Sequence, residues 1–367
     1  MHLGRDQERA LNGEAGPARE WAMGILVELG DRSGASRLVP VGSVHIPDWC
    51  GQRPSEAWTW LRAMAGSASL PVTANPERGD GAAVPERKAT LEALNRRTAY
   101  SFSCAPYLSG NHPGRGEVVA WGGRAASSFA NSVLGARTEM ESFEVAAAAA
   151  IAGLVPERGL HLEDNRRPTV AVVVPRGKDA DLPSIGRSLS GRLRGEVPLL
   201  CGVAPTFDDA KKLAFALNSR GNVPLFRMQR EPAPPEGMRR IEVGPTADDL
   251  VAAPDLVVLG CPHLSEQDIN RWSKRLAGRS ASKVEAWFFT SRLCRDKCPV
   301  FGAVLRSRGR VFVDRCPLGM ISELRGRTVA CDSPALADCL RESGTLALYA
   351  SEREILSILT GDGASGH

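Results

Sequence analysis

Three cysteines stand where a metal cluster could be held. Cys104, Cys261 and Cys316 come from well-separated segments, each follows a short apolar run, and each has a proline within two residues. Ligands of α/β proteins gather at the carboxyl ends of strands, so thiols that follow apolar strands can meet at one edge. This placement fits the ligands of an iron–sulfur cluster. Three protein ligands rather than four would leave one iron open to bind substrate.

Two other interpretations of these thiols stay open. They could be ordinary buried cysteines, because the compact C-x-x-C array typical of many cluster sites is not present. Alternatively, the same thiolates could bind zinc. Cys294 and Cys298 resemble half a zinc site but lack a second pair of ligands nearby, so we interpret them as a chance surface pair. The remaining cysteines are predicted to be packing residues: Cys50, Cys201, Cys331 and Cys339.

The elements that must position these thiols follow an alternating pattern. From residue 169 onward, short apolar runs alternate with helical segments of about ten residues, and Thr206 and Ser265 are predicted N-caps. Nearer the N-terminus we expect strands at residues 23–27 and 38–41. Alternating strands and helices predict an α/β fold in which parallel sheets are flanked by helices.

The length of 367 residues suggests two or three lobes. We expect residues 1–20 to be a disordered tail and residues 361–367 to be a flexible one. The body between them, residues 21–360, is predicted to divide into lobes at 21–165 and 166–360.

Composition narrows the partners and the compartment. The net charge is +4 without any basic run, which argues against nucleic acid as a partner. No stretch of 18 apolar residues exists and residues 1–16 are polar, so we expect neither a membrane span nor a signal peptide. The prediction is a cytoplasmic protein whose nine cysteines are mostly reduced, and an odd number of them argues against a complete disulfide framework.

Several motifs, in family order from about residue 40 to 320, resemble the large subunit or catalytic domain of the aconitase X family. The strongest is FANSVLGART, residues 129–138, which is similar to that family's signature. The other matching pieces are Cys104-Ala105-Pro106-Tyr107, Ala120-Trp121-Gly122, Gly159-Leu160-His161-Leu162 through Asn165-Arg166, and Gly260-Cys261-Pro262-His263, with weaker echoes at Val44-His45-Ile46, residues 71–75 and Asp314-x-Cys316.

The resemblance implies an iron–sulfur hydro-lyase with an aconitase-like, multi-lobed body of parallel sheets. Members dehydrate small hydroxy acids such as cis-3-hydroxy-L-proline or mevalonate 5-phosphate. Cys104, Cys261 and Cys316 fall on the positions implied for the cluster ligands, with the open iron acting as a Lewis acid on the substrate hydroxyl. The base is implied to come from a small swivelling domain, which this chain lacks, so a second polypeptide of that type is the expected partner.

The resemblance also indicates polar site residues. The catalytic candidates are His45, Ser132, Arg137 and His263; the substrate-binding candidates are Thr73, Asn75, Asn131, Arg124, Arg227 and Ser333. A structural role stays open for most of them. The two histidines can be hydrogen-bonded groups beside strand ends, Arg137 can satisfy a helix C-terminus, and Thr73 and Asn75 can cap a turn.

Several positions depart from the family's pattern. Gly123-Arg124-Ala125 replaces a Glu-Ser segment, Glu139-Met140 replaces Asn-Arg, and Ser333-Pro334-Ala335 replaces Ser-Gly-Lys. A family His is Arg227 here, and Pro47-Asp48 replaces Ser-Gly. Either the pocket has been rebuilt for another substrate, with Arg124 and Arg227 as anion clamps, or the acid/base groups are gone and the chain is a binding or scaffold paralogue.

Overall fold

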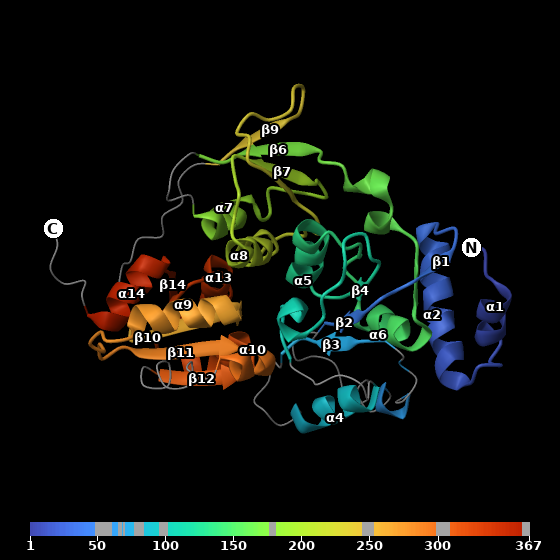
Figure 1. Ribbon diagram of the computed structural model, residues 1–367, viewed down its shortest axis with the longest axis horizontal. Coiled ribbons are helices and arrows are strands. Elements are labelled where there is room, and N and C mark those ends of the chain that lie inside the picture. Colours follow the sequence, from blue (N-terminus) through green and yellow to red (C-terminus); the bar gives the residue numbers. More distant parts are fainter. Residues whose placement is uncertain are drawn as a thin grey trace.

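The computed structural model describes residues 1–47, 61–64, 68, 70–76, 84–94, 102–175, 181–243, 253–298 and 309–361. Its strands form four sheets, of which three are parallel, and helices pack around them (Figure 1). The predicted α/β class with parallel sheets and flanking helices is therefore confirmed. Among these residues, no helix is both long enough and apolar enough to cross a lipid bilayer.

The N-terminal part is built around a small parallel sheet. Its strands, in spatial order, are β3 (Val72–Ala74), β2 (Val44–Ile46) and β4 (Ala120–Trp121). The alanine-rich helix α6 (Phe143–Ala152) packs on this sheet, because its small side chains allow a close approach. Beside them, β1 (Leu38–Pro40) pairs antiparallel with β5 (Leu154–Pro156), and α4 (Val84–Leu94) lies near β3.

Two sequence predictions at the N-terminus are wrong. Residues 1–20 form no disordered tail: they contain α1 (Arg5–Leu11) and the start of α2 (Pro17–Ser33), and Ala10 is buried against α2. Residues 23–27, predicted as a strand, are helical within α2. Their apolar run belongs to a longer helical pattern, with Ala22, Met23, Leu26 and Gly30 buried on one face and Pro17 in the first turn.

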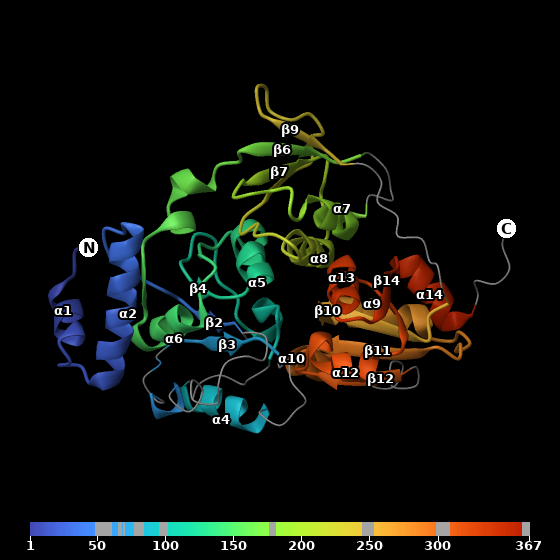
Figure 2. The same ribbon diagram turned by 180° about the vertical axis from the view of Figure 1, so that it is seen from behind.

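The middle of the chain forms a second parallel sheet. Its strands, in spatial order, are β8 (Arg227–Gln229), β7 (Pro198–Cys201), β6 (Val170–Val173) and β9 (Arg240–Glu242). The helices α7 (Leu182–Leu189) and α8 (Phe207–Leu217) pack together beneath it (Figures 1 and 2). Thr206 caps α8 as predicted, with its hydroxyl accepting from the Asp209 N–H.

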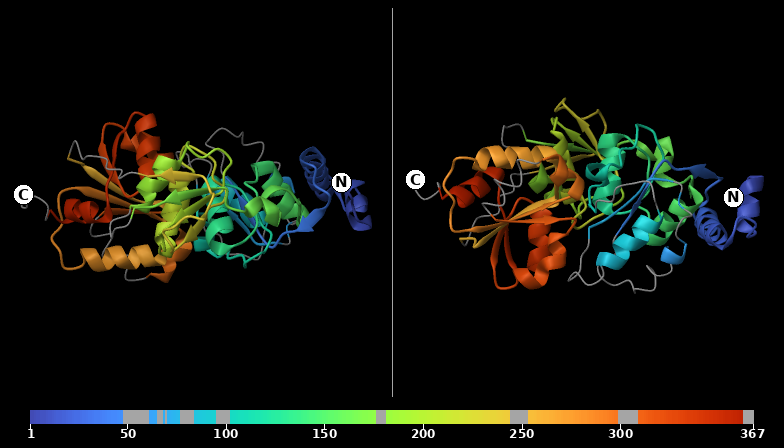
Figure 3. Two further views of the ribbon diagram at one scale, coloured as in Figure 1. Left: turned by 90° about the horizontal axis from the view of Figure 1, so that it is seen from above. Right: turned by 60° about the horizontal axis from the view of Figure 1, so that its bottom comes forward.

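The C-terminal part is a five-stranded parallel sheet. In spatial order its strands are β12 (Gly309–Val313), β11 (Glu285–Thr290), β10 (Leu256–Leu264), β13 (Thr328–Cys331) and β14 (Leu346–Tyr349). Its helices are α9 (Glu266–Leu276), α10 (Arg292–Lys297), α12 (Ile321–Leu324), α13 (Pro334–Glu342) and α14 (Glu352–Thr360). Figure 3 shows helices on both sides of this sheet, and a separate apolar cluster lies on each of its faces. Ser265 caps α9 as predicted.

Several short helices lie between these strands and helices. They are the 3₁₀ turns η1 (Pro106–Ser109), η3 (Gly159–His161), η4 (Glu163–Arg166) and η5 (Pro317–Met320), the helix α5 (Arg124–Phe129), and the π-helical turn η2 (Ala130–Leu134). Helix α8 contacts α5, α13 and β10, so it lies at the junction of all three parts. The predicted lobe over residues 166–360 thus contains two separate sheets, and the lobe boundaries stay a prediction.

Candidate functional site

The three singled-out cysteines line one pocket, which we call the cysteine pocket. The residues lining it are Asn75, Pro76, Cys104, Phe215, Gly260, Cys261, His263, Cys316, Pro317 and Leu318. They come from the N-terminal part, from α8 and from the five-stranded sheet. The pocket therefore forms only where the three parts of the chain meet.

Backbone contacts fix the segment that carries Cys104. The N–H of Ser103 donates to the carbonyl of Ala74 at 3.0 Å, which continues the N-terminal sheet. The N–H of Phe102 donates to Asp314 Oδ1 at 3.2 Å, two residues before Cys316. Asp314 Oδ1 also accepts from the Arg292 N–H at 2.8 Å. Asp314 thus joins the first cysteine segment to the third.

Cys261 lies within β10, at the end of the sheet's central strand. Gly260 before it has φ +105°, and a Cβ there would lie 2.2 Å from the carbonyl oxygen of Phe289 on β11. Only glycine tolerates this backbone and this close approach. The strand therefore bends at Gly260 and presents the Cys261 thiol to the pocket.

Cys316 follows β12 and precedes η5. The ring of His263, two residues after Cys261, donates from Nε2 to the carbonyl of Arg315 at 2.8 Å. His263 Nδ1 is buried and accepts no hydrogen bond from the residues that the structure describes. Burial lowers the pKa of His263 to about 4, with a smaller contribution from the nearby Lys211 charge and against the bond to Arg315, so its ring is neutral at neutral pH.

The surroundings of the thiols favour a positively charged occupant. Burial raises the pKa of Cys261 well above its usual value, and the neighbouring thiols Cys316 and Cys104 raise it further. Such thiols give up their protons when a metal supplies compensating charge. The three side chains that face the pocket with sulfur are thus able to hold a metal group together.

Zinc and a cluster are both possible occupants for thiol ligands. Within the ranges that the structure describes, no three His, Cys, Asp or Glu side chains are grouped as the ligands of one metal ion. Metal analysis of the protein distinguishes a cluster from zinc at the three thiols.

The predicted His45, Thr73 and Asn75 form one buried network at the pocket's edge. His45 is fully buried, its Nε2 is 2.9 Å from Asn75 Oδ1 and its Nδ1 is 3.0 Å from Thr73 Oγ1. When Nε2–H donates to Asn75, the Thr73 hydroxyl, which accepts from Asn111, has a single proton for either His45 Nδ1 or the carbonyl of Val44. Burial lowers the pKa of His45 to about 4. Of these three, Asn75 lines the pocket.

The polar residues of the family signature make contacts within their own neighbourhood. Asn131 exchanges hydrogen bonds with the backbone of Thr138, and Ser132 Oγ accepts from the Phe226 N–H at 2.9 Å. Arg137 donates to the carbonyl of His161 at 2.8 Å and to Glu163 at 2.6 Å. None of the three predicted residues is among those lining the cysteine pocket. Their roles in a site stay predictions.

The other predicted substrate contacts also lie outside the pocket's lining. Arg124 is exposed and reaches the carbonyl of Gly221 at 3.5 Å, and Arg227 is half-buried on β8. Ser333 caps α13, with its hydroxyl accepting from the Leu336 N–H at 3.2 Å. They too stay predictions as substrate ligands.

The interpretation of Cys294 and Cys298 as a surface pair is wrong, because both are buried in the core under the five-stranded sheet. Their four-residue spacing on a short helix places both on its inner side. Cys201 and Cys331 are fully buried, as expected of packing residues, whereas Cys339 is half-buried. Cys50 lies outside the described residues.

Sequence reasoning missed a buried group of charges next to the pocket. Lys211 and Lys212 on α8 pair with Asp268 and Asp332 of the C-terminal part. A signal was available, since Lys211 falls on the apolar face of α8 with Ala210 and Ala214. A lysine at such a position needs a buried partner.

Comparisons with known proteins identify the family of the chain. A family model described as "Aconitase X first domain" matches residues 1–164, and one described as "Aconitase X third domain" matches residues 254–357. A phosphomevalonate dehydratase large subunit of Methanothermobacter thermautotrophicus is 34% identical over 353 residues, with 86% of this chain and 88% of the relative covered. The chain belongs to the aconitase X family.

Two further relatives bear on this aconitase X member. A cis-3-hydroxy-L-proline dehydratase of Hypocrea jecorina is 30% identical over 315 residues, covering 74% of this chain and 52% of the relative. The crystal structure of aconitase X from Thermococcus kodakaraensis, in a holo-form, superposes with a TM-score of 0.84 at 27% identity, covering 98% of this chain and 100% of that one. The named relatives are dehydratases, so the predicted hydro-lyase class is confirmed.

Proposed function

We propose that this chain is the large subunit of an iron–sulfur-dependent dehydratase that acts on a small hydroxy acid. The observation that carries the proposal is the meeting of Cys104, Cys261 and Cys316 in one pocket. These thiols would hold the cluster, which when bound supplies a Lewis-acidic iron for the hydroxyl that leaves.

The rest of the pocket suits a small substrate held away from water. Phe215, Pro317 and Leu318 supply apolar walls. His263 presents Nδ1, a bare acceptor, because its Nε2–H is committed to Arg315. With a pKa of about 4, His263 is a poor general base at neutral pH, and its role is to accept a hydrogen bond from the substrate and orient it.

The proton acceptor is expected from a second polypeptide. The lining residues that the structure describes include no carboxylate and no cation. The phosphomevalonate dehydratase relatives carry the name "large subunit", which implies a small one. We infer that a small subunit closes over the cysteine pocket and brings the base that removes the neighbouring C–H proton.

Anaerobic reconstitution tests the cluster. The purified chain is incubated with iron and sulfide, and we expect bound iron, bound sulfide and a brown chromophore in the wild type. Cys104→Ser should lose all three, whereas Cys201→Ser should keep them, because Cys201 ends a strand of the four-stranded sheet instead. A colourless, iron-free wild type, or stoichiometric zinc without visible absorbance, would refute the cluster.

A second assay tests turnover. The reconstituted chain, combined with its small subunit, is offered mevalonate 5-phosphate, cis-3-hydroxy-L-proline and hydroxy-dicarboxylates, and one of them should be dehydrated. Cluster binding without turnover of any small hydroxy acid would favour the alternative, a binding or scaffold paralogue, which the replacements at Gly123, Arg124 and Ala335 also suit.

A further inference from the structure

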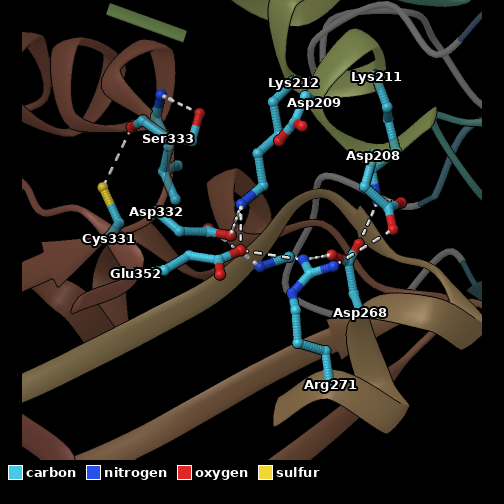
Figure 4. Close-up of polar contacts among 12 residues, drawn as sticks. Asp208, Asp209, Lys211, Lys212, Asp268, Arg271, Cys331, Asp332, Ser333 and Glu352 are labelled. Atoms are coloured by element: carbon cyan, nitrogen blue, oxygen red, sulfur yellow. Dashed lines mark hydrogen bonds and ion pairs between the residues drawn. The ribbon is translucent and has the colours of Figure 1, made fainter. Parts of the chain in front are cut away.

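Two consecutive lysines of α8 reach out of the middle part of the chain into the C-terminal part. The side chain of Lys211 is fully buried and that of Lys212 is one-tenth exposed. Figure 4 shows both side chains extending from α8 toward carboxylates, Asp332 among them, at the carboxyl ends of the sheet's strands. Burying two ammonium groups is costly unless each is paired and hydrogen-bonded, so these contacts define their geometry.

Lys211 makes two hydrogen bonds and an additional ion pair. Nζ donates to the carbonyl of His263 at 3.0 Å and to Asp268 Oδ2 at 2.5 Å, and it lies 3.1 Å from Asp208 Oδ1. Burial alone would lower the pKa of Lys211, but Asp268 and Asp208 raise it above its ordinary value. Lys211 is therefore a buried cation whose position is specified by two acceptors and a second carboxylate.

One of these acceptors belongs to the cysteine pocket. The carbonyl that Lys211 holds is that of His263, two residues after Cys261. The ring of the same His263 donates to the carbonyl of Arg315, the residue before Cys316. A single chain of hydrogen bonds thus runs from α8 through His263 to the segments of two cysteines.

Asp268 strengthens the same connection. Its Oδ2 accepts from the N–H of Ser265 at 3.1 Å, and its own N–H donates to Ser265 Oγ at 3.0 Å. This capping box begins α9 directly after the Cys261 strand. Lys211 therefore holds the backbone after Cys261 at two points, His263 and the start of α9.

Lys212 acts on the other side of the same cysteine. Its Nζ is 3.0 Å from Asp332 Oδ2, and the N–H of Gly260 donates to Asp332 Oδ1 at 3.4 Å. Lys212 is thus linked, through Asp332, to the residue before Cys261, and Lys211 is linked to the residues after it.

We propose that Lys211 is a positioning residue that sets the Cys261 and Cys316 segments from α8, through the carbonyl and the ring of His263. This inference rests on the proposed function, since the two thiols are proposed cluster ligands. It assigns to the middle part of the chain a task in cluster retention, although that part supplies none of the three proposed ligands.

The test uses a variant that keeps the fold. Lys211→Met alone would leave Asp268 buried without its cation and could unfold the protein. The double variant Lys211→Met with Asp268→Asn removes both charges and keeps an acceptor for the Ser265 N–H. Lys274→Met is the matched control, because Lys274 is exposed on α9. Thermal unfolding of each metal-free protein verifies that it is folded.

Two readouts separate this inference from the proposed function. In the metal-free protein, the alkylation rate of each cysteine is measured by peptide mass spectrometry, with Cys201 as the internal reference. In the reconstituted protein, the rate of iron loss to a chelator is measured. For the double variant we expect alkylation of Cys261 and Cys316 relative to Cys201, and the rate of iron loss, each to rise about 10- to 100-fold.

The outcomes are distinct. Faster alkylation of the two pocket cysteines in a protein that binds no cluster supports the positioning role and refutes the proposed function. Unchanged alkylation in a folded double variant refutes the positioning role, whether or not the cluster binds. Equal acceleration at Cys201 also refutes it, because the change would then be general loosening.

Discussion

The cysteine pocket and the signature segment, residues 129–138, differ in whether their polar side chains already make hydrogen bonds within the protein. In the pocket, three thiols face one cavity, and His263 Nδ1 has no hydrogen-bond partner in the described part of the chain. In the signature segment, Asn131 makes hydrogen bonds with Thr138, with Pro224 and with the guanidinium of Arg166. The pocket therefore offers the ring nitrogen of His263 to a ligand, whereas the side chain of Asn131 in the signature segment is already hydrogen-bonded to neighbouring groups.

Arg166 shows how completely the signature segment is occupied. Its buried guanidinium donates to Asn131 Oδ1 and to the carbonyls of Asn131, Leu160 and Ala136, at 2.8–3.1 Å. Burial, with Arg227 and Arg137 nearby, lowers the pKa of Arg166 to about 10. A motif can therefore mark a family because it holds the fold, and the two regions should respond differently to mutation.

The largest expected effect is at the pocket. Cys316→Ser should abolish iron and sulfide binding and dehydration, because one of the three proposed ligands is lost. The metal-free protein should lose only about 1–3 kcal/mol of unfolding free energy, the cost of a buried hydroxyl. Metal analysis and denaturant unfolding check this. Cys294 is buried in the same part of the chain, and Cys294→Ser should keep the cluster. Loss of the cluster in this control would show that lining the cysteine pocket does not distinguish ligands from other cysteines.

Next comes the buried guanidinium. Arg166→Met should lower the unfolding free energy by about 3–5 kcal/mol, because four acceptors lose their donor in the interior. At low temperature, where the variant is folded, the cluster should remain. Arg167→Met is the control: this neighbour is exposed and pairs with the exposed Asp164, so its removal should cost about 0–1 kcal/mol. Loss of the cluster in a folded Arg166→Met variant would contradict the view that the signature segment stabilises the fold without contributing to the cysteine pocket.

The third effect depends on pH. Burial, as the largest cause, lowers the pKa of His161 to about 4, below the ordinary 6.5. Between pH 6.5 and 4 the unfolded chain binds a proton at this residue that the folded chain does not, so stability falls as pH falls. His161→Gln should remove about 1.4 kcal/mol per pH unit from that slope. Urea unfolding at several pH values measures it, and an unchanged slope would contradict the assignment.

The smallest effect is expected at Arg137. Its side chain is 30% exposed and pairs with Glu163, which is 66% exposed. Arg137→Met should cost about 0–1 kcal/mol and leave kcat/KM within roughly threefold. Steady-state kinetics with the reconstituted enzyme decide this. A tenfold or larger fall in kcat/KM, with cluster and stability intact, would make Arg137 the anion contact that the resemblance suggests.

The sequence predicted the convergence of thiols but little of what holds them. Strand periodicity and the rule that ligands gather at strand ends were sufficient for Cys261 and Cys316. Asp314, whose carboxylate joins Phe102 to Arg292, could not be inferred, because its partners lie 22 and 212 residues away. Short apolar runs that alternate with helical segments likewise predicted the C-terminal strands. Residues 23–27 were wrongly predicted as a strand, because an apolar run of five fits a strand as well as a helix.

The positions of the three cysteines also constrain how the protein matures. Domains emerge from the ribosome with the N-terminal part first. Cys104 is therefore made while more than two hundred residues are still to be synthesised. Its segment gains its contact with Asp314, and the pocket gains its third thiol, only after residues 314–316 have emerged. We therefore expect insertion of the proposed cluster to follow synthesis of the C-terminal part, and a nascent chain arrested before Asp314 would carry Cys104 and Cys261 without the contact that joins the first cysteine segment to the third.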